Sequence, residues 1–555
     1  MKNLIFLVAI FFALGKSQAQ TIGLFTNNAS TDGYVLFAPN FANTTYLIDK
    51  CGYQVHSWVG TRNPGQAVYL LEDGTLLRTG RVNNTTINGG GLGGIIEKVS
   101  WDGTVTWSYT ISSSTQTQHH DAIMLPNGNV LAIVWVIKTA AEATAAGRNP
   151  ALVGTSVWSE KIVEIQPNGP TGGTIVWEWN VWDHLAQDFD ATKPNFGVIS
   201  DHPELINLNY NAVSTNADWL HFNGLDYNEA LDQIVISNHN HDEIWIIDHS
   251  TSMSEAASHN GGAHNLGGDL MYRWGNPASY NRGTTADQKL FGQHNPRWIE
   301  DEFPGAGSIS IFNNGIQRPG GNYSTVETFT PPIDANGEYA ITAGQSYLPA
   351  AADWIYSATP TNSFYSMNIS GAQRLANGNT IVCSGASGNF FEIDPSNTVV
   401  WKYVNPVGQG GNIGTQGSTI NQNSVFRCSL YPLDYSGLAG FDLTPGNPIE
   451  LNPTAYDCNM ITGISENNEE NNASISIVNP FSNSLKLLNK TALKNATITL
   501  SGISGNRIDS WYYPELVAGK TSEIELPNSL NDGIYFLNIK ENNSNKTFKL
   551  IRRRN

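Results

Sequence analysis

Short runs of alternating apolar and polar residues, separated by turns that contain glycine, recur along most of the chain. In the commonest version an apolar run leads through an Asp-Gly or Asn-Gly turn to a second apolar run that contains tryptophan. The runs at 96–99 and 105–109 are one example, and those at 391–394 and 399–403 are another. A period of two residues with turn-forming residues between the runs predicts antiparallel β-strands.

The tryptophans of these units mark the repeats. Five tryptophans end successive units: Trp58, Trp107, Trp177, Trp274 and Trp401. The gap before the last of them is long enough for two units. We expect residues 326–329 to fill the missing slot. Six units of about 70 residues would each hold a four-stranded propeller blade of about 40–50 residues plus long loops. The pattern predicts an all-β fold with a six-bladed β-propeller over residues 20–459.

The two ends of the chain differ from this repeat. A lysine, an apolar run at 4–14 and the small residues Ser17 and Ala19 are typical of a signal peptide, which we place at 1–19 with cleavage after Ala19. The asparagine- and glutamate-rich stretch at 460–472 predicts a linker. Behind it, residues 473–555 alternate as the strands of a small β-sandwich. From Ser474 onward the chain has 11 basic and 6 acidic residues, although its overall net charge is −18.

Composition narrows the classes of partner. A net charge of −18 argues against nucleic acid, because phosphate backbones bind basic surfaces. No apolar stretch after the signal peptide reaches the roughly 20 residues of a membrane span. The four cysteines show no C-x-x-C spacing, which disfavours a zinc or redox pair. Because Cys428 and Cys458 bracket a loop-rich stretch, we expect a disulfide between them.

The 12 histidines all precede residue 295 and divide into two sets. Six stand singly, and we expect them to be ordinary surface or structural residues: His56, His184, His202, His249, His259 and His264. The other six lie in four motifs, each in or next to a loop that feeds a repeat strand: Gln118-His119-His120-Asp121, Asp218-Trp219-Leu220-His221-Phe222-Asn223, Ser237-Asn238-His239-Asn240-His241 and Gly292-Gln293-His294. All four motifs are therefore candidates to face one propeller axis.

Converging histidines allow three interpretations. Neutral imidazoles bind zinc or copper, and His239 and His241 have chelating spacing, but the chain has no H-x-x-E-H type motif. A neutral imidazole is also a nucleophile for transfer of an anionic group, with other histidines as cations or hydrogen-bond donors. The third interpretation gives the histidines no chemical role. We favour group transfer without a metal or a cofactor, because the chain offers no other basic cluster to meet an anion.

The order of these motifs resembles that of the bacterial arylsulfate sulfotransferases. The shared features are His-His-Asp before Leu-Pro-Asn-Gly-Asn, then Asp-Trp-x-His-x-Asn, then a strand ending in serine, then Gln-His before Asn-Asn-Gly. The resemblance covers residues 34–442. It implies a six-bladed propeller enzyme that moves a sulfuryl group from an aryl sulfate to a phenolic acceptor through a sulfated histidine. It also implies that no 3′-phosphoadenosine donor is used.

Carried over motif by motif, the resemblance implies roles for particular residues. His294 would be the nucleophile. His221 would bind the sulfuryl oxygens and exchange a proton with the phenol oxygen. His120, with His119 beside it, would supply a third contact.

The chain departs from the family pattern at the fourth motif. Where the family has an arginine after the strand serine, this chain has His239 and His241, and either is a candidate for that place. A histidine replaces the permanent charge of a guanidinium only when it is protonated. We also expect Asn223 and Trp219 to contact the substrate.

The C-terminal block closely resembles the sorting domain of the bacterial type IX secretion system. It has a strand leading into Asn479-Pro480-Phe481, a Gly-x-Tyr strand and a final Thr-Phe-Lys-Leu-Ile. This resemblance implies that the type IX machinery exports the protein through the periplasm to a secreted or cell-surface location.

Two other functions fit the same sequence. One is a non-catalytic propeller that binds sulfated or other glycans or ligands. The other is a sulfate ester hydrolase on the same scaffold, with water as the acceptor. Release of phenol from an aryl sulfate, with and without an added phenolic acceptor, distinguishes the three.

Overall fold

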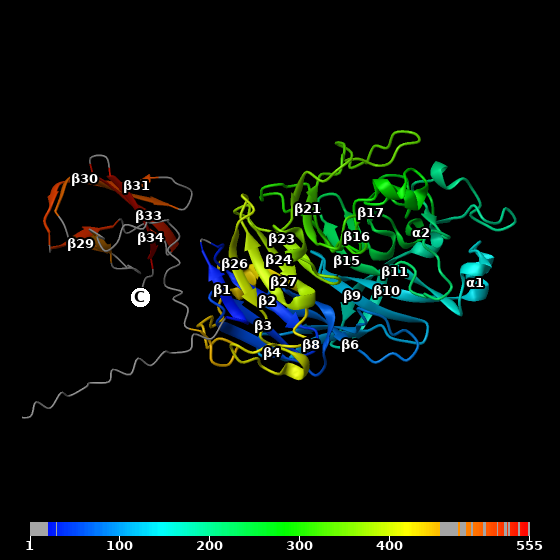
Figure 1. Ribbon diagram of the computed structural model, residues 1–555, viewed down its shortest axis with the longest axis horizontal. Coiled ribbons are helices and arrows are strands. Elements are labelled where there is room, and N and C mark those ends of the chain that lie inside the picture. The colour runs from blue at the N-terminus through cyan, green and yellow to red at the C-terminus, as the bar shows by residue number, and fades with distance from the viewer. Residues whose placement is uncertain are drawn as a thin grey trace, which may run out of the picture. The chain divides into compact units, whose positions relative to one another are not determined.

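The computed structural model describes residues 20–28, 30–454, 475–477, 484–489, 492–502, 507–518, 520–526, 530, 533–541 and 544–552. The expected signal peptide, the expected linker and Cys458 lie outside the described residues. The chain divides into two compact units, Met1–Tyr456 and Asp457–Asn555, which we describe separately. Strands dominate both units (Figure 1), which confirms the all-β prediction.

Six antiparallel sheets of four or five strands make up most of the described part of the first unit. The first holds β27 (Val425–Tyr431), β2 (Tyr34–Pro39), β3 (Thr44–Asp49) and β4 (Gln54–Val59). The second holds β5 (Pro64–Leu70), β6 (Leu76–Arg81), β7 (Gly94–Val99) and β8 (Val105–Thr110). The third holds β9 (Gln116–Met124), β10 (Val130–Thr139), β11 (Ser156–Asn168) and β12 (Gly172–Asn180).

The other three sheets follow in chain order. The fourth holds β15 (Phe222–Asn228), β16 (Gln233–Asn238), β17 (Glu243–Asp248) and β18 (Tyr272–Trp274). The fifth holds β19 (His294–Trp298), β20 (Ile309–Asn313), β21 (Thr325–Phe329) and β22 (Trp354–Tyr356). The sixth holds β23 (Gly371–Arg374), β24 (Thr380–Ser384), β25 (Asn389–Ile393), β26 (Val399–Val404) and β1 (Gly23–Asn27).

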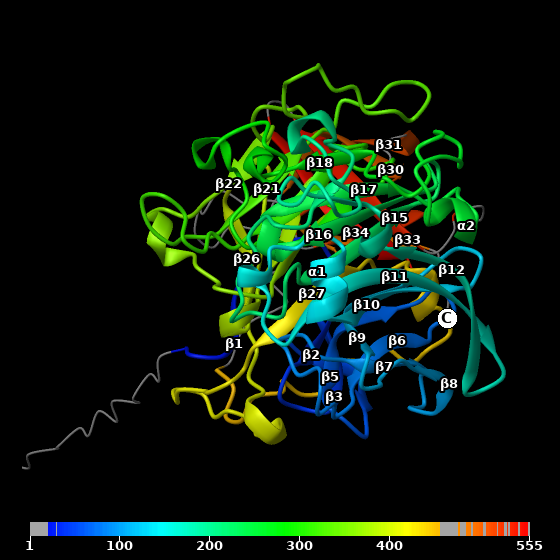
Figure 2. The same ribbon diagram turned by 90° about the vertical axis from the view of Figure 1, so that its right-hand side faces the viewer.

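The remaining elements of the first unit are short. A parallel pair joins β13 (Leu185–Ala186) to β14 (Ile206–Asn207). The two α-helices are α1 (Ala140–Ala145) and α2 (Met253–Ala256), and each begins with a capping box. Figure 2 shows α1 next to the ends of β10 and β11, and α2 contacts β12.

Glycine turns join the strands where the sequence predicts them. The amide of Leu125 donates to the carbonyl of Asn129 at 2.8 Å, and Gly128 between them has a φ of 83°. Gly74 and Gly378 stand at the same place in matching turns, with φ of 79° and 88°. Glycine adopts this left-handed conformation without steric cost, which explains why the Asp-Gly and Asn-Gly pairs recur with the strands.

The inner strands of the six sheets contact one another in cyclic order. β5 contacts β9, β9 contacts β15, and β15 contacts β19. β19 contacts β23, β23 contacts β27, and β27 contacts β5. The contacts therefore form a closed cycle. The N-terminal and C-terminal strands of the unit both help to close it, because β1 pairs with β26 and β27 pairs with β2. Figure 1 shows the blue β1 beside β26.

The tryptophan pattern locates five of the outer strands. The five tryptophans that close the predicted units lie in β4, β8, β12, β18 and β26. Residues 326–329, expected to fill the missing slot, belong to β21, the third strand of the fifth sheet, which lies in the gap between Trp274 and Trp401. The outer strand of that sheet is β22, which contains Trp354. A long irregular connection between β21 and β22 separates this tryptophan from the repeat.

Cys428 is a free, buried thiol, so the predicted Cys428–Cys458 disulfide is wrong. The reason is that β27 extends across positions 425–431 and takes Cys428 into the interior of the first sheet instead of a loop. Cys383 on β24 is also free and buried.

The second unit contains two antiparallel sheets in its described part. One has β28 (Ile475–Ile477), β29 (Ser484–Asn489) and β32 (Thr521–Glu525). The other has β31 (Arg507–Leu516), β30 (Leu493–Gly502), β33 (Gly533–Glu541) and β34 (Ser544–Arg552). One hydrophobic cluster includes Leu485, Leu487 and Ile524 of the smaller sheet together with Ile498 and Leu537 of the larger.

A buried ion pair links the first and sixth sheets. Lys50, just after β3, places its Nζ atom 2.6 Å from Oε2 of Glu392 on β25, and their side chains are 4% and 0% exposed. The ammonium also lies 3.9 Å from the ring of Trp401. Glu392 accepts further hydrogen bonds from Thr31 and Asn379, so both carboxylate oxygens are satisfied.

We expect Lys50→Met to lower the free energy of unfolding by about 3–5 kcal/mol, because it leaves the Glu392 carboxylate buried without its cation. The midpoint of chemical unfolding measures this loss, and adding Glu392→Gln should recover part of it. Lys98→Met is the control, since Lys98 pairs at 3.7 Å with an exposed Asp73 and such pairs contribute at most about 1 kcal/mol. Equal effects of the two lysine substitutions would contradict the role of the buried pair.

Candidate functional site

The histidine motifs lie at irregularities of the inner strands. β9, β15 and β19 each have a β-bulge in the stretch that carries a motif. Beside these bulges His120, His221 and Asn295 have φ of 51°, 58° and 59°. Non-glycine residues seldom adopt this left-handed conformation, and such strain concentrates at functional sites. Bulges re-aim side chains relative to the regular alternation of a strand, and here they accompany a convergence of histidines from three sheets.

Five histidine rings form a continuous chain of contacts. The ring centroids of His119 and His120 are 5.1 Å apart, and those of His120 and His221 are 4.7 Å apart. His221 then lies 5.2 Å from His239, which lies 5.4 Å from His294. His221 and His239 in the middle are half-buried, whereas the other three rings are buried. The four predicted motifs therefore meet, and solvent reaches the chain of five histidines at its middle.

Hydrogen bonds fix the proton of His294. Its Nδ1 atom lies 2.8 Å from Oδ1 of Asn314 and 3.1 Å from the carbonyl oxygen of Gly292. The Asn314 amide is held in this orientation because its Nδ2 donates to the carbonyls of Ser366 and Ile369. Since both neighbours of Nδ1 are acceptors, Nδ1 carries the proton and Nε2 has the lone pair. Burial lowers the pKa of His294 well below 6.5, so the ring is neutral at neutral pH.

His221 has the opposite protonation state. Its Nδ1 donates to Oδ2 of Asp218 at 2.5 Å. Burial disfavours a charge on the ring, but the adjacent carboxylate more than offsets this, and the pKa of His221 is raised above 6.5. His221 is therefore the member of the chain that takes up a proton most readily, and its protonated ring has an Nε2–H group to donate.

Glu160 controls the protons of the first two rings. Its Oε2 lies 2.8 Å from Nε2 of His119, whose Nδ1 lies 2.8 Å from Nδ1 of His120. Burial, together with the charge of Asp218, raises the pKa of Glu160 well above 4.5, and burial lowers the pKa of both rings. The neutral carboxyl group then donates to His119, which donates to His120. This order leaves the proton of His120 on Nε2, where it is a hydrogen-bond donor.

His239 is a neutral ring in this arrangement. Its Nδ1 donates to Oδ1 of Asn240 at 2.8 Å, and the Asn240 amide nitrogen donates to the carbonyl of Asp218. Burial, followed by the nearby charge of His221, lowers the pKa of His239 to about 4. Near the place where the family has an arginine, this chain therefore has a neutral imidazole, that of His239, instead of a permanent cation.

Three of the expected site residues are buried beside the chain of five histidines and are not part of it: His241, Trp219 and Asn223. The ring of His241 packs 5.1 Å from Tyr210 and 5.7 Å from Trp219. Trp219 is 2% exposed and donates from Nε1 to the carbonyl of Tyr210, so it belongs to the core. The Asn223 side chain donates to the carbonyl of Gln293. The structure thus places His239, and not His241, beside His221 and His294.

An arginine that the sequence motifs do not include supports the site from β27. Arg427 donates to Oδ2 of Asp121 at 2.6 Å, to the hydroxyl of Tyr69 at 2.9 Å and to the carbonyl of Asn223 at 3.0 Å. Its charge contributes to lowering the pKa of both His120 and His294. The position of Asp121 directly after His120 is a visible signal, but nothing in the sequence around Arg427 connects it with a histidine motif.

A glycine-rich segment passes over His120. The amide of His120 donates to the carbonyl of Gly91 at 2.8 Å. A Cβ atom on Gly91 would overlap the His120 ring, and one on Gly93 would overlap the side chain of Gln118. Only glycine lets the backbone approach the ring this closely. The glycines at 89–91 and 93–94 were a sequence signal for this contact.

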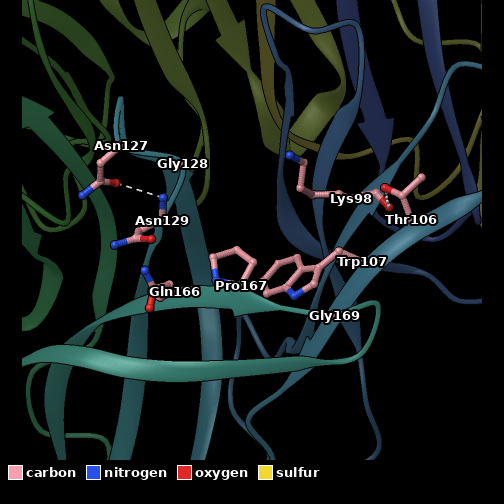
Figure 3. A pocket seen from close by; sticks show the side chains of 9 residues that line it. All are labelled: Lys98, Thr106, Trp107, Asn127, Gly128, Asn129, Gln166, Pro167 and Gly169. Atoms are coloured by element: carbon pink, nitrogen blue, oxygen red, sulfur yellow. Dashed lines mark hydrogen bonds between the residues drawn. The ribbon is translucent and has the colours of Figure 1, made fainter.

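A polar depression of about 470 Å³ lies elsewhere, between the second and third sheets. Figure 3 shows Lys98 and Thr106 on one side of it and Asn127 and Asn129 on the other, with Trp107 between. The Asn-Gly-Asn turn that borders it follows β9, beyond the strand end farther from His119 and His120. No histidine lines this depression.

The chain of five histidines thus contains a neutral imidazole with a fixed lone pair, His294, and a ring of raised pKa, His221, with the ring of His239 between them. The chain belongs to the arylsulfotransferase (ASST) family, whose model matches residues 25–423. The predicted resemblance is thereby confirmed. No curated protein matches the chain.

Similar solved structures are distant. A protein of unknown function from Bacteroides caccae is 10% identical, with a TM-score of 0.39, over 72% of this chain and 99% of that one. A streptogramin B lyase is 13% identical, with a TM-score of 0.32, over 74% and 95%. A virginiamycin B lyase from Staphylococcus aureus, bound to quinupristin, is 10% identical, with a TM-score of 0.33, over 75% and 100%. These values carry no argument about function.

Residues 479–553 match the model of a secretion system C-terminal sorting domain. This confirms the predicted sorting domain and indicates export to a secreted or cell-surface location. Within the described part of the chain, no helix combines the length and apolarity needed to cross a bilayer.

We expect Asp218→Asn to lower the pKa of His221 from above 6.5 to below it. The substitution removes the carboxylate that stabilises the imidazolium and leaves the burial that opposes it. NMR titration of labelled histidine C2–H signals measures the shift. Asp232→Asn is the control, because Asp232 pairs with His249 outside the chain of five histidines. A His221 pKa that stays above 6.5 in Asp218→Asn would show that another group stabilises the cation.

Proposed function

We propose that this protein is a secreted arylsulfate sulfotransferase that works through an N-sulfo-histidine intermediate, with an aryl sulfate as donor and a phenol as acceptor. The observation that carries the proposal is the His294–Asn314 hydrogen bond, which leaves a lone pair on Nε2 of a neutral ring. Membership of the arylsulfotransferase family supports the same reaction. No cofactor takes part in the proposed steps.

In the first step Nε2 of His294 attacks the sulfur of the aryl sulfate. An N–S bond forms, the S–O bond to the aryl group breaks, and its electron pair leaves with the phenolate oxygen. His221 donates its Nε2 proton to that oxygen and becomes neutral. In the second step His221 takes the proton of the acceptor phenol, whose oxygen attacks sulfur as the N–S bond breaks. Each proton lost in one step is recovered in the other.

The negative charge on the sulfuryl oxygens of the bound aryl sulfate needs hydrogen-bond donors close to those oxygens. The Nε2–H group of His120 provides one of them throughout, and that of His221 provides a second until its proton passes to the phenolate oxygen; both rings belong to the same chain of contacts. His239 occupies the place of the family arginine in this proposal. Because a bound sulfate ester is an anion, it raises the pKa of His239 from its low value and favours proton uptake on binding.

We propose that the six sheets are the blades of a six-bladed β-propeller at 20–459, since their inner strands contact one another in a closed cycle. Residues 473–555 form a small sandwich in this proposal, supported by the hydrophobic cluster common to both sheets of the second unit. The signal peptide at 1–19 and the linker at 460–472 complete the arrangement. We infer that the type IX secretion machinery is the partner of the sorting domain.

We expect His294→Asn to abolish transfer from an aryl sulfate to an added phenol, because no nucleophile is left. It should also abolish an adduct of about 80 Da, the mass of SO3, on the exported protein after brief exposure to donor. Intact mass spectrometry measures the adduct and also gives the C-terminal end of the exported chain. His202→Asn, at an exposed histidine outside the site, should keep both.

The dependence of donor cleavage on the acceptor separates the competing functions. Transfer requires the added phenol for turnover, whereas a hydrolase releases product without it and a binding protein releases none. Sulfate transfer by His294→Asn at the wild-type rate would exclude His294 as the nucleophile.

The rate of transfer should pass through a maximum as pH changes. It should fall on the acid side as His294, whose pKa lies well below 6.5, takes up a proton and loses the lone pair that attacks sulfur. It should fall on the alkaline side as His221 loses its proton above pH 6.5, because its pKa is raised. Asp218→Asn should move the alkaline side to lower pH, because it removes the carboxylate that raises the pKa of His221. A profile of kcat that is flat across the titration range of histidine would contradict these assignments.

A further inference from the structure

A second histidine cluster lies where the third sheet meets the fourth. His184 follows β12, and His259 and Asp269 belong to the loop between α2 and β18. The Nδ1 atoms of His184 and His259 each lie 2.8 Å from Oδ1 of Asp269. All three atoms lie within 4.8 Å of one another. The cluster has no residue in common with the chain of five histidines.

The protons around His184 do not balance for a neutral ring. Its Nε2 lies 2.9 Å from the carbonyl oxygen of Ala256, so Nε2 carries the proton and donates it. Its Nδ1 then holds a lone pair, which faces the Oδ1 atom of Asp269 at 2.8 Å. A neutral imidazole has a single N–H group, and an ionised carboxylate only accepts. Either a second proton on the ring or a metal ion bound by both Nδ1 and the carboxylate satisfies this contact, and the ring itself is 0% exposed.

The surroundings hold the His184 ring in one orientation. Trp179 stacks on it with an interplanar angle of 5°, and the indole Nε1 donates to the carbonyl of Gly268. A Cβ atom on Gly268 would overlap the carbonyl oxygen of Ala256 and crowd the His184 ring. Metal-binding histidines commonly donate their second N–H group to a backbone carbonyl, as His184 does to Ala256. The ring is therefore oriented before any ion arrives.

We propose that His184, His259 and Asp269 bind a divalent transition metal ion of the zinc type. Two imidazole nitrogens and one carboxylate oxygen suit such an ion, which completes its coordination with water. His259 is 56% exposed, so the ion enters from its side. The metal fastens the loop between α2 and β18 to the end of β12, and thereby joins two neighbouring sheets. Its role is to stabilise this junction, apart from the sulfotransfer site.

The test compares zinc content and thermal stability of the full chain. Protein stripped with chelator is dialysed against zinc and then against buffer, and bound metal is measured by elemental mass spectrometry. We expect His259→Ala to bind one equivalent less zinc per chain than the wild type, and zinc to raise the Tm of the wild type but not of the variant. Because His259 is exposed, this substitution leaves the folded core intact.

Two further variants complete the test. Asp269→Asn should lose the same equivalent, because an amide oxygen is a poorer ligand for zinc than a carboxylate. His202→Ala is the matched control, since His202 is exposed and bonds Glu204 outside the cluster, and it should bind as much zinc as the wild type. Equal zinc content in His259→Ala and the wild type would overturn the proposal, as would a wild-type protein that holds no zinc after dialysis.

Discussion

The pairing of the two ends of the first unit is the constraint on which the site depends. β1 completes the sheet that contains β26, and β27 completes the sheet that begins with β2. β27 also carries Arg427, which reaches Asp121 on β9. The histidine motifs come from strands far apart in the sequence, and their convergence requires that the inner strands close on one another. Lys50 and Glu392 reinforce that closure with a buried charge pair between the first and sixth sheets.

Within the site, burial and the carboxylate of Asp218 together set the protonation states of the histidines. Burial alone makes an imidazole neutral, which suits a nucleophile but removes the acid that a leaving group needs. Asp218 reverses this for a single ring, so that His221 carries a proton while His294 does not. Burial and the charge of Asp218 raise the pKa of Glu160, which becomes a neutral donor. Two environments thus give different functions to the chemically identical side chains of His294 and His221.

The sequence contained enough information to predict the strands, the sorting domain and the convergence of four histidine motifs. Alternation and glycine turns are local, and the order of the motifs is specific. Asp218 and Asn314 belong to the quoted motifs, but Glu160 and Arg427 were not visible, because they lie far in sequence from the rings whose protons or pKa they affect. Trp219 and His241 looked like substrate contacts by proximity in the motif, yet both side chains are buried against each other and Tyr210 in the core. Which side of a bulge a residue faces depends on tertiary pairing.

Asn314 precedes Gly315, and Asn-Gly is the dipeptide most prone to deamidation, in which the glycine nitrogen attacks the side-chain carbonyl. Here the glycine amide donates to the carbonyl of Phe291, while the Asn314 amide is held on both its oxygen and its nitrogen. Cyclisation would have to break all of these bonds in a fully buried residue. The contacts that orient His294 therefore also protect the protein from chemical ageing at the position where a new carboxylate would stabilise the protonated, non-nucleophilic form of this histidine.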